Sequence, residues 1–156
     1  MSDLPASVLF ACTYNAARSP MAEALLRHFH GLSMAVRSVG VFKGDVDPFA
    51  QAVMDEIGIS IARHRPATFD ELEDATFDLV ISLSPEAQHH AVEMTRDAAR
   101  DVLFWNMFDP TLTEGSREMR LDAYRSVRDT LKARILERFP LSPLATPPAE
   151  RRMTPR

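Results

Sequence analysis

Four short apolar segments alternate along this chain with segments that begin with helix-start signals. Segments of four to eight residues that are rich in Val, Leu, Ile and Phe are typical of strands buried on both faces of a sheet. Their alternation with helices predicts right-handed βαβ units around a parallel sheet, and therefore an α/β fold. The expected strands are Ser7–Ala11, Ala35–Val39, Phe77–Leu83 and Asp101–Trp105.

Three of the four expected helices open on Ser-Pro or Asp-Pro. The polar side chain of such a pair caps free amides, and proline suits the first helical position. In the fourth helix, apolar residues recur at helical spacing and form one buried stripe. The expected helices run from Ser19 to about Gly31, from Asp47 to Gly58, from Ser84 towards Arg100, and from Ser116 to Arg138.

The chain has 156 residues, enough for one domain with a hydrophobic core, which we expect over residues 1–139. Residues 140–156 hold five of the eleven prolines and three arginines, a composition that predicts a flexible tail. The net charge of −4 argues against a general nucleic-acid binder.

No apolar run approaches the roughly 20 residues that cross a bilayer, so no membrane partner is expected. Residues Met1–Pro5 carry no basic region ahead of an apolar stretch, which argues against a signal peptide. The single cysteine excludes an internal disulfide and favours a reducing compartment, so we expect a cytoplasmic protein.

In a sheet of parallel strands, ligands bind at the carboxyl ends of the strands. The first expected strand is followed there by Cys12-Thr13-Tyr14-Asn15-Ala16-Ala17-Arg18-Ser19 and then by a helix. A tight loop that closes onto a helix N-terminus directs N–H groups inward, and the helix dipole adds positive potential. Such donors, with a planar guanidinium, suit the three charged oxygens of a transferring phosphoryl group. The predicted phosphate-binding loop is Thr13, Tyr14, Asn15, Ala16, Ala17 and Arg18.

Cys12 is the predicted nucleophile, because a thiol near a cation and a helix N-terminus ionises easily. Ser19 either donates a hydrogen bond to this sulfur, caps the helix, or alternates between the two. Asn15 tolerates a left-handed backbone and is expected to brace the loop. The alternative interpretation is a buried strand-end Cys12 and a surface Arg18; the strand, the Ser-Pro pair and Asn15 favour the phosphate site.

The segments Val8–Asn15 and Ala17–Glu23 resemble the low-molecular-weight protein tyrosine phosphatases and their relatives, the thioredoxin-coupled arsenate reductases. The ending, Gly115–Asp129, is most similar to the arsenate-reductase branch. The resemblance implies a three-layer sandwich with a four-stranded parallel sheet in the order 2-1-3-4. Further similarity lies in Arg37–Gly40, Gly58–His64 and Phe108–Pro110.

Ester cleavage requires a proton for the departing oxygen and later a base for water, and one carboxyl can serve both steps. Asp109 follows the last expected strand and matches the family's acid loop, so it is the predicted acid, stiffened by Pro110. The resemblance also implies that Ser38 and His64 hydrogen-bond to the loop Asn and keep its shape. For both, a surface polar residue is the alternative interpretation.

This sequence also departs from the family. Tyr14 stands where a glycine is usual, and its side chain either forms a wall of the pocket for an aromatic substrate, together with Phe42, or obstructs the pocket mouth. The additional redox cysteines of thioredoxin-linked arsenate reductases are lacking, so an intramolecular disulfide relay is excluded. No metal or other cofactor is expected, because the adjacent His89 and His90 point in different directions on a helix and read as solvated.

The sequence therefore predicts a cysteine-dependent phosphatase that hydrolyses phosphate monoesters, such as protein phosphotyrosine or another aryl phosphate, through a phosphocysteine. The expected partners are a phosphorylated protein or small phosphate ester as substrate, and phosphate or another oxyanion as product or inhibitor. One alternative is an arsenate reductase that uses an external low-molecular-weight thiol. Another is a phosphate-binding module without turnover.

Overall fold

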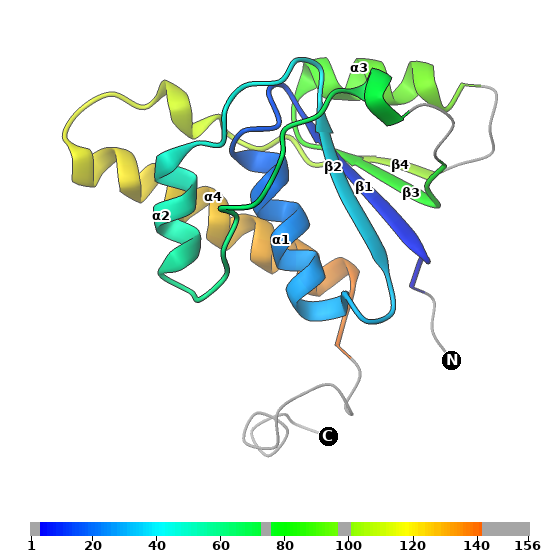
Figure 1. Ribbon diagram of the computed structural model, residues 1–156, viewed down its shortest axis with the longest axis horizontal. Helices are drawn as coiled ribbons and strands as arrows, with labels where there is room; N and C mark the ends of the chain where they lie inside the picture. The colour runs from blue at the N-terminus through cyan, green and yellow to red at the C-terminus, as the bar shows by residue number, and fades with distance from the viewer. Residues whose placement is uncertain (1–3, 73–75, 97–100, 142–156) are drawn as a thin grey trace.

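The computed structural model describes residues 4–72, 76–96 and 101–141. Its four parallel strands form one sheet in the order β2-β1-β3-β4, which confirms the expected α/β fold and strand order (Figure 1). Both inner strands, β1 and β3, are almost entirely buried, as their apolar sequences require. The strands are β1 Ser7–Cys12, β2 Ala35–Gly40, β3 Leu79–Ser82 and β4 Asp101–Phe104.

Within the described residues, four α-helices and two short 3-10 helices connect and cover these strands. The α-helices are α1 Arg18–His30, α2 Pro48–Asp55, α3 Pro85–Met94 and α4 Arg117–Arg138. The 3-10 helices are η1 Phe69–Leu72 and η2 Pro110–Leu112. None of the helices within the described ranges is both long and apolar enough to span a membrane.

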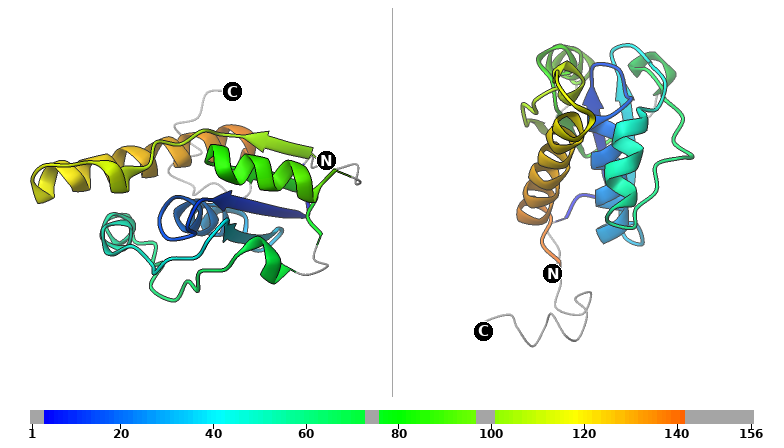
Figure 2. Two further views of the ribbon diagram at one scale, coloured as in Figure 1. Left: turned by 90° about the horizontal axis from the view of Figure 1, so that it is seen from above. Right: turned by 90° about the vertical axis from the view of Figure 1, so that its left-hand side faces the viewer.

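The described residues form two hydrophobic cores, one on each face of the sheet, so the sheet is the middle of three layers. The larger core lies between the sheet and helices α1, α2 and α4, and the smaller one joins the opposite face of the sheet to α3 and η1. Helix α4 packs against both α1 and α2, and its length carries it beyond the sheet (Figure 2). The burial of both faces explains why the inner strands β1 and β3 carry nearly continuous apolar runs rather than alternating ones.

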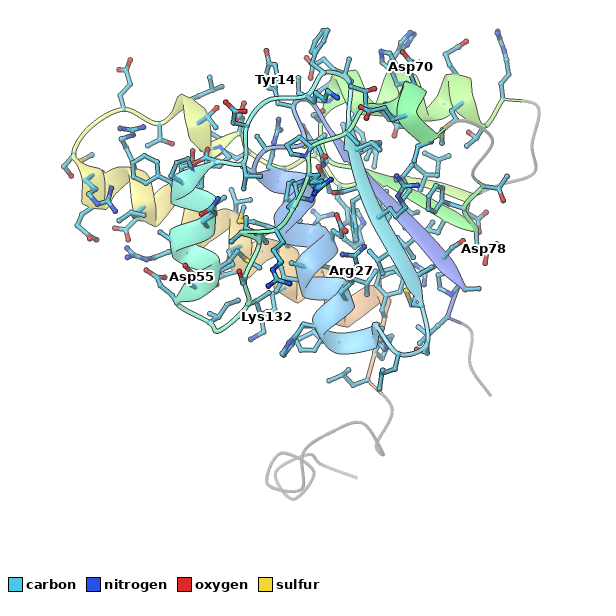
Figure 3. All side chains as sticks on the ribbon, in the orientation of Figure 1. Tyr14, Arg27, Asp55, Asp70, Asp78 and Lys132 are labelled. Atoms are coloured by element: carbon cyan, nitrogen blue, oxygen red, sulfur yellow. The ribbon has the colours of Figure 1, made fainter. Side chains whose placement is uncertain are left out.

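The parallel strands bring sequence-distant loops to one edge. Figure 3 shows Tyr14 at the end of the molecule towards which the strands run, and Asp78 at the opposite end. At that opposite end, the Ala6 amide donates to the Asp78 carboxylate over 2.9 Å, and the Asp78 amide donates to Ser7 Oγ over 3.0 Å. These bonds tie the start of β3 to the start of β1.

The expected caps at Asp47 and Ser84 are confirmed, because each side chain accepts a hydrogen bond from an amide of the first helical turn. Ser116 caps α4 in the same way. Helix α1 differs: it begins at Arg18, and its N-cap position is Ala17, with no side-chain cap bond. Capping by Ser19 is therefore wrong, because this residue is buried inside the first turn.

Two further expectations need correction. Helix α2 ends at Asp55, three residues before Gly58, which lies in a left-handed turn with φ of 75°. Helix α3 ends at Met94, well short of Arg100, and Thr95 Oγ1 donates back to the Ala91 carbonyl over 2.9 Å. Residues 97–100 and most of the expected tail, from residue 142 onwards, lie outside the described residues.

Candidate active site

The loop between β1 and α1 is held from outside through its carbonyl groups. Four of them accept hydrogen bonds from amides of residues 41–47 over 2.8–3.1 Å. In a trans peptide the next residue's N–H points opposite to the carbonyl, and the peptides here are trans. The following amides therefore point towards the interior of the loop. The accepting carbonyls are those of Cys12, Thr13, Tyr14 and Ala16, so the inward amides are those of Thr13, Tyr14, Asn15 and Ala17.

Asn15 braces this loop from beneath. It is fully buried and adopts a left-handed backbone with φ of 54°. Its amide nitrogen donates to Ser19 Oγ over 2.8 Å and to Ser38 Oγ over 2.9 Å. Its amide oxygen accepts from His64 Nε2 over 3.0 Å and from the Ala67 amide over 2.9 Å. All four hydrogen-bonding positions of the side chain are thus occupied.

Glu23 extends this network, and sequence reasoning did not single it out as a site residue. Ser38 Oγ donates to Glu23 Oε1, His64 Nδ1 lies 3.6 Å from the same oxygen, and Arg27 forms an ion pair of 2.7 Å with the other oxygen. Its spacing could have indicated this role, because Glu23 lies four residues after Ser19 and therefore on the same face of α1.

Burial lowers the pKa of His64 below its ordinary value of 6.5, against the opposing attraction of the Glu23 carboxylate. The imidazole is therefore neutral at pH 7. Because Asn15 Oδ1 can only accept, the single ring proton sits on Nε2 and is donated to it. His64 thus supports the loop as a neutral donor.

The Cys12 sulfur lies at the floor of the loop. Although the residue is only 2% exposed, it lines a hollow of about 160 Å³ together with Ala17, Arg18 and Asp109. Ser19 Oγ lies 2.8 Å from the sulfur and accepts from Asn15, so its own proton goes either to the sulfur or, over 3.4 Å, to the Val39 carbonyl. A hydroxyl donor in this position stabilises a thiolate.

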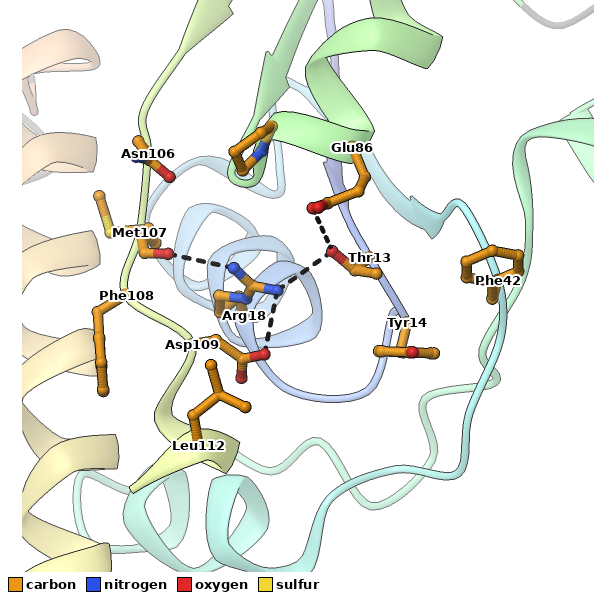
Figure 4. A pocket seen from close by; sticks show the side chains of 11 residues that line it. Thr13, Tyr14, Arg18, Phe42, Glu86, Asn106, Met107, Phe108, Asp109 and Leu112 are labelled. Atoms are coloured by element: carbon orange, nitrogen blue, oxygen red, sulfur yellow. Dashed lines mark hydrogen bonds and ion pairs between the residues drawn. The ribbon is translucent and has the colours of Figure 1, made fainter. Parts of the chain in front are cut away.

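Arg18 is buried and lines this hollow, and Figure 4 shows its contacts with Thr13, Met107 and Asp109. Its Nη1 donates to the Met107 carbonyl over 3.1 Å, which anchors the guanidinium to the loop after β4. Its Nη2 lies 3.4 Å from Thr13 Oγ1 and 3.8 Å from Asp109 Oδ2. The guanidinium is therefore fixed between the phosphate-binding loop and the expected acid, rather than directed at solvent.

Asp109 follows β4 and reaches the same hollow. Its Oδ1 accepts from the Thr111 amide over 3.0 Å and from Thr111 Oγ1 over 2.7 Å. Its Oδ2 faces Arg18, and the side chain is one-quarter exposed. One carboxyl oxygen is thus held by the loop while the other remains on the side of the hollow.

A larger cavity of about 550 Å³ adjoins the hollow and shares Tyr14, Arg18 and Asp109 with it (Figure 4). Tyr14 and Phe42 form one side, with ring centroids 5.8 Å apart. Phe108 and Leu112 line the cavity from the loop after β4, and sequence reasoning did not name them as walls. Both are well exposed, so their role is visible only once the loops are placed together.

Within the described ranges no three His, Cys, Asp or Glu side chains lie close enough together to hold a metal ion. His89 and His90 are both exposed, and the His90 ring stacks on Phe69 with centroids 5.4 Å apart.

Comparisons with known proteins agree with this geometry. The family model of low molecular weight phosphotyrosine protein phosphatases matches residues 7–138. An arsenate reductase of Halalkalibacterium halodurans is 32% identical over 130 residues, which cover 82% of this chain and 91% of that protein. The YwlE arginine phosphatase from Geobacillus stearothermophilus is 28% identical with a TM-score of 0.68, over 84% of this chain and 88% of that one.

A further solved structure shows the shared fold. The tyrosine phosphatase Wzb from Escherichia coli K30, in complex with sulphate, superposes with a TM-score of 0.70 at 23% identity. The match covers 86% of this chain and 96% of that one.

Proposed function

Because this chain belongs to the low molecular weight phosphotyrosine protein phosphatase family, we propose that it hydrolyses phosphate monoesters through a phosphocysteine intermediate on Cys12. The observation that carries this proposal is the hollow of about 160 Å³ in which Cys12, Arg18 and Asp109 meet. Its size and its inward amides suit a tetrahedral oxyanion. We place the reaction in the cytoplasm, where the thiol stays reduced.

Substrate binding relies on donors that are already in position. The inward amides of the loop and the Arg18 guanidinium hold the three non-bridging phosphoryl oxygens above the Cys12 sulfur. Because Arg18 is fixed by the Met107 carbonyl, little reorganisation is required when the substrate binds.

In the first chemical step, the Cys12 thiolate forms a bond to phosphorus while the ester P–O bond breaks. Asp109 gives its proton to the departing oxygen, so the alcohol or phenol leaves neutral. In the second step, Asp109 accepts a proton from water, which attacks phosphorus and breaks the S–P bond. Inorganic phosphate leaves, and Cys12 returns to the thiolate held by Ser19.

The cavity beside the hollow supports an aryl group as the leaving group. Tyr14 and Phe42 offer an aromatic wall, and Phe108 and Leu112 add apolar surface from the loop after β4. Protein phosphotyrosine is therefore the substrate class that we propose, or another aryl phosphate of similar shape.

The test is hydrolysis of p-nitrophenyl phosphate in a chelator, with an optimum expected on the acidic side of neutral. Cys12→Ser should abolish turnover, and Asp109→Ala should lower kcat about 10²–10⁴-fold. Mass spectrometry after acid quenching should show one added phosphoryl group on the Cys12 peptide. Phosphate binding without any turnover of aryl phosphates would refute the proposal.

A second candidate is arsenate reduction, favoured by the 32% identity with an arsenate reductase. Cys12 would displace hydroxide from arsenate, and an external thiol would then attack the Cys12 sulfur. That attack would form a mixed disulfide and release arsenic as arsenite, with two electrons supplied by the two thiols. The sequence contains no other cysteine, so the second thiol must come from outside. Rapid arsenate reduction with glutathione or mycothiol, with aryl phosphates inert, would favour this activity.

A further inference from the structure

Glu86 places a carboxylate on the wall of the larger cavity. It lies in the first turn of α3, and Figure 4 shows its side chain directed towards Thr13 at the cavity wall. Thr13 Oγ1 lies 3.2 Å from Glu86 Oε1 and 3.4 Å from Arg18 Nη2. One hydroxyl therefore separates the Glu86 carboxylate from the guanidinium of the phosphate site.

This carboxylate has no cationic partner among the described residues. Other exposed glutamates of the same region are paired: Glu71 lies 3.2 Å from Lys43, and Glu93 lies 3.4 Å from Arg96. No such ion pair joins Glu86 to a Lys, Arg or His in the parts of the chain that the structure describes. An unpaired charge on a cavity wall acts on whatever occupies the cavity.

The other charged groups of the cavity also favour a cationic leaving group. Its charged lining side chains are Arg18, Asp109 and Glu86. Arg18 is bound to the Met107 carbonyl and lies at the phosphate hollow, so its charge is directed to the phosphoryl group. The rest of the cavity therefore presents acidic groups and apolar rings to the leaving group.

We propose that Glu86 selects phosphate monoesters whose leaving group carries a positive charge near the aryl ring. This inference rests on the proposed phosphatase activity and specifies its substrate class. Phe42 and Leu112 contact the apolar part of the leaving group, and Glu86 attracts a neighbouring ammonium or guanidinium. A carboxylate in the same place on the substrate is repelled.

The test uses three aryl phosphates with the same reacting group, whose leaving groups differ in charge. The leaving group of phosphotyramine is cationic, that of p-ethylphenyl phosphate is neutral, and that of 3-(4-phosphooxyphenyl)propanoate is anionic. We expect kcat/KM to favour the cation over the anion by roughly five- to tenfold at low salt. Glu86→Gln should bring this ratio close to one, and Glu86→Lys should reverse it. The matched control is Glu93→Gln on the exposed side of the same helix, which should leave the ratio unchanged.

The outcomes separate this inference from the phosphatase proposal. Hydrolysis of all three esters with equal kcat/KM, or a ratio that Glu86→Gln does not change, overturns the role of Glu86 and leaves the phosphatase standing. If no ester is hydrolysed, the phosphatase proposal fails. The ratio of dissociation constants in Cys12→Ser protein, measured by calorimetry, then still decides whether Glu86 distinguishes the two charges.

Discussion

Gly40, the last residue of β2, lies directly behind the phosphate-binding loop. An alanine there would place its Cβ 2.3 Å from the Phe42 carbonyl oxygen, 2.7 Å from the Asn15 amide nitrogen and 2.8 Å from the Tyr14 carbonyl carbon. Ordinary contacts of a Cβ begin at 3.4 Å, and all three neighbours are backbone atoms that cannot rotate away. The Gly40→Ala substitution therefore requires the loop or its outer support to move by about 1 Å.

Two measurable losses follow from this displacement. Inserting a methyl group into a packed site costs about 1–3 kcal/mol of unfolding free energy. A misplacement of about 1 Å at reacting groups costs on the order of 10²-fold in rate. For Gly40→Ala we therefore expect kcat for p-nitrophenyl phosphate to fall about 100-fold, and the urea midpoint to fall with it.

Gly44→Ala provides the matched control. Its Cβ would lie 3.7 Å from Tyr14 Cβ and 3.8 Å from Ala16 Cβ, which are ordinary contacts. We expect kcat within about twofold of the wild type for this variant, since packing without overlap leaves the loop in place. Circular dichroism should show that both variants are folded. Wild-type kcat and stability in Gly40→Ala would refute the claim that the loop depends on this close approach.

Two further predictions concern the supports of the loop. Tyr124→Phe removes the hydroxyl that donates to the Asp47 carboxylate, and the Asp47 amide in turn donates to the Ala16 carbonyl of the loop. Urea denaturation should therefore show a loss of about 1.5 kcal/mol in unfolding free energy. An unchanged urea midpoint would contradict this. Because burial lowers the pKa of His64 in the folded state, the unfolded chain binds the extra proton first as pH falls below 6.5. The wild type should therefore lose stability from pH 7 to pH 5, and His64→Gln should lose less; equal pH slopes would be inconsistent with a buried neutral imidazole.

Much of the fold was predictable because its signals are local. The Ser84 and Asp47 caps precede proline and act on amides two or three positions away, so the dipeptides alone locate the helix starts. The strand order was not available from such signals and came from the resemblance. The same rule gave a wrong prediction at Ser19, because its hydroxyl is buried beneath the loop beside the Cys12 sulfur and does not cap the helix.

The residues of the proposed site were predictable from the sequence, but their surroundings were not. Cys12, Asn15 and Arg18 lie within seven residues, and their spacing predicts an oxyanion loop. The contact between Thr13 and Glu86 spans 73 positions, and no local pattern predicts it. The parallel sheet creates that contact by bringing the ends of β1 and β3 side by side. The same cause brings Leu112 to the cavity wall, although nothing in the sequence around Leu112 marks it as a pocket residue.

The site divides into two parts that differ in how strongly they are constrained. Beneath the loop, every hydrogen-bonding position of the Asn15 amide is used, so a change to Ser38 or His64 leaves a buried polar group unsatisfied. Such a change should impair every substrate alike, because all of them use the same oxyanion cradle. At the rim, the Tyr14 and Glu86 side chains line a wide cavity, and substitutions there leave the hydrogen bonds of the Asn15 side chain intact. Substrate choice can therefore change at the rim while the phosphoryl chemistry stays the same.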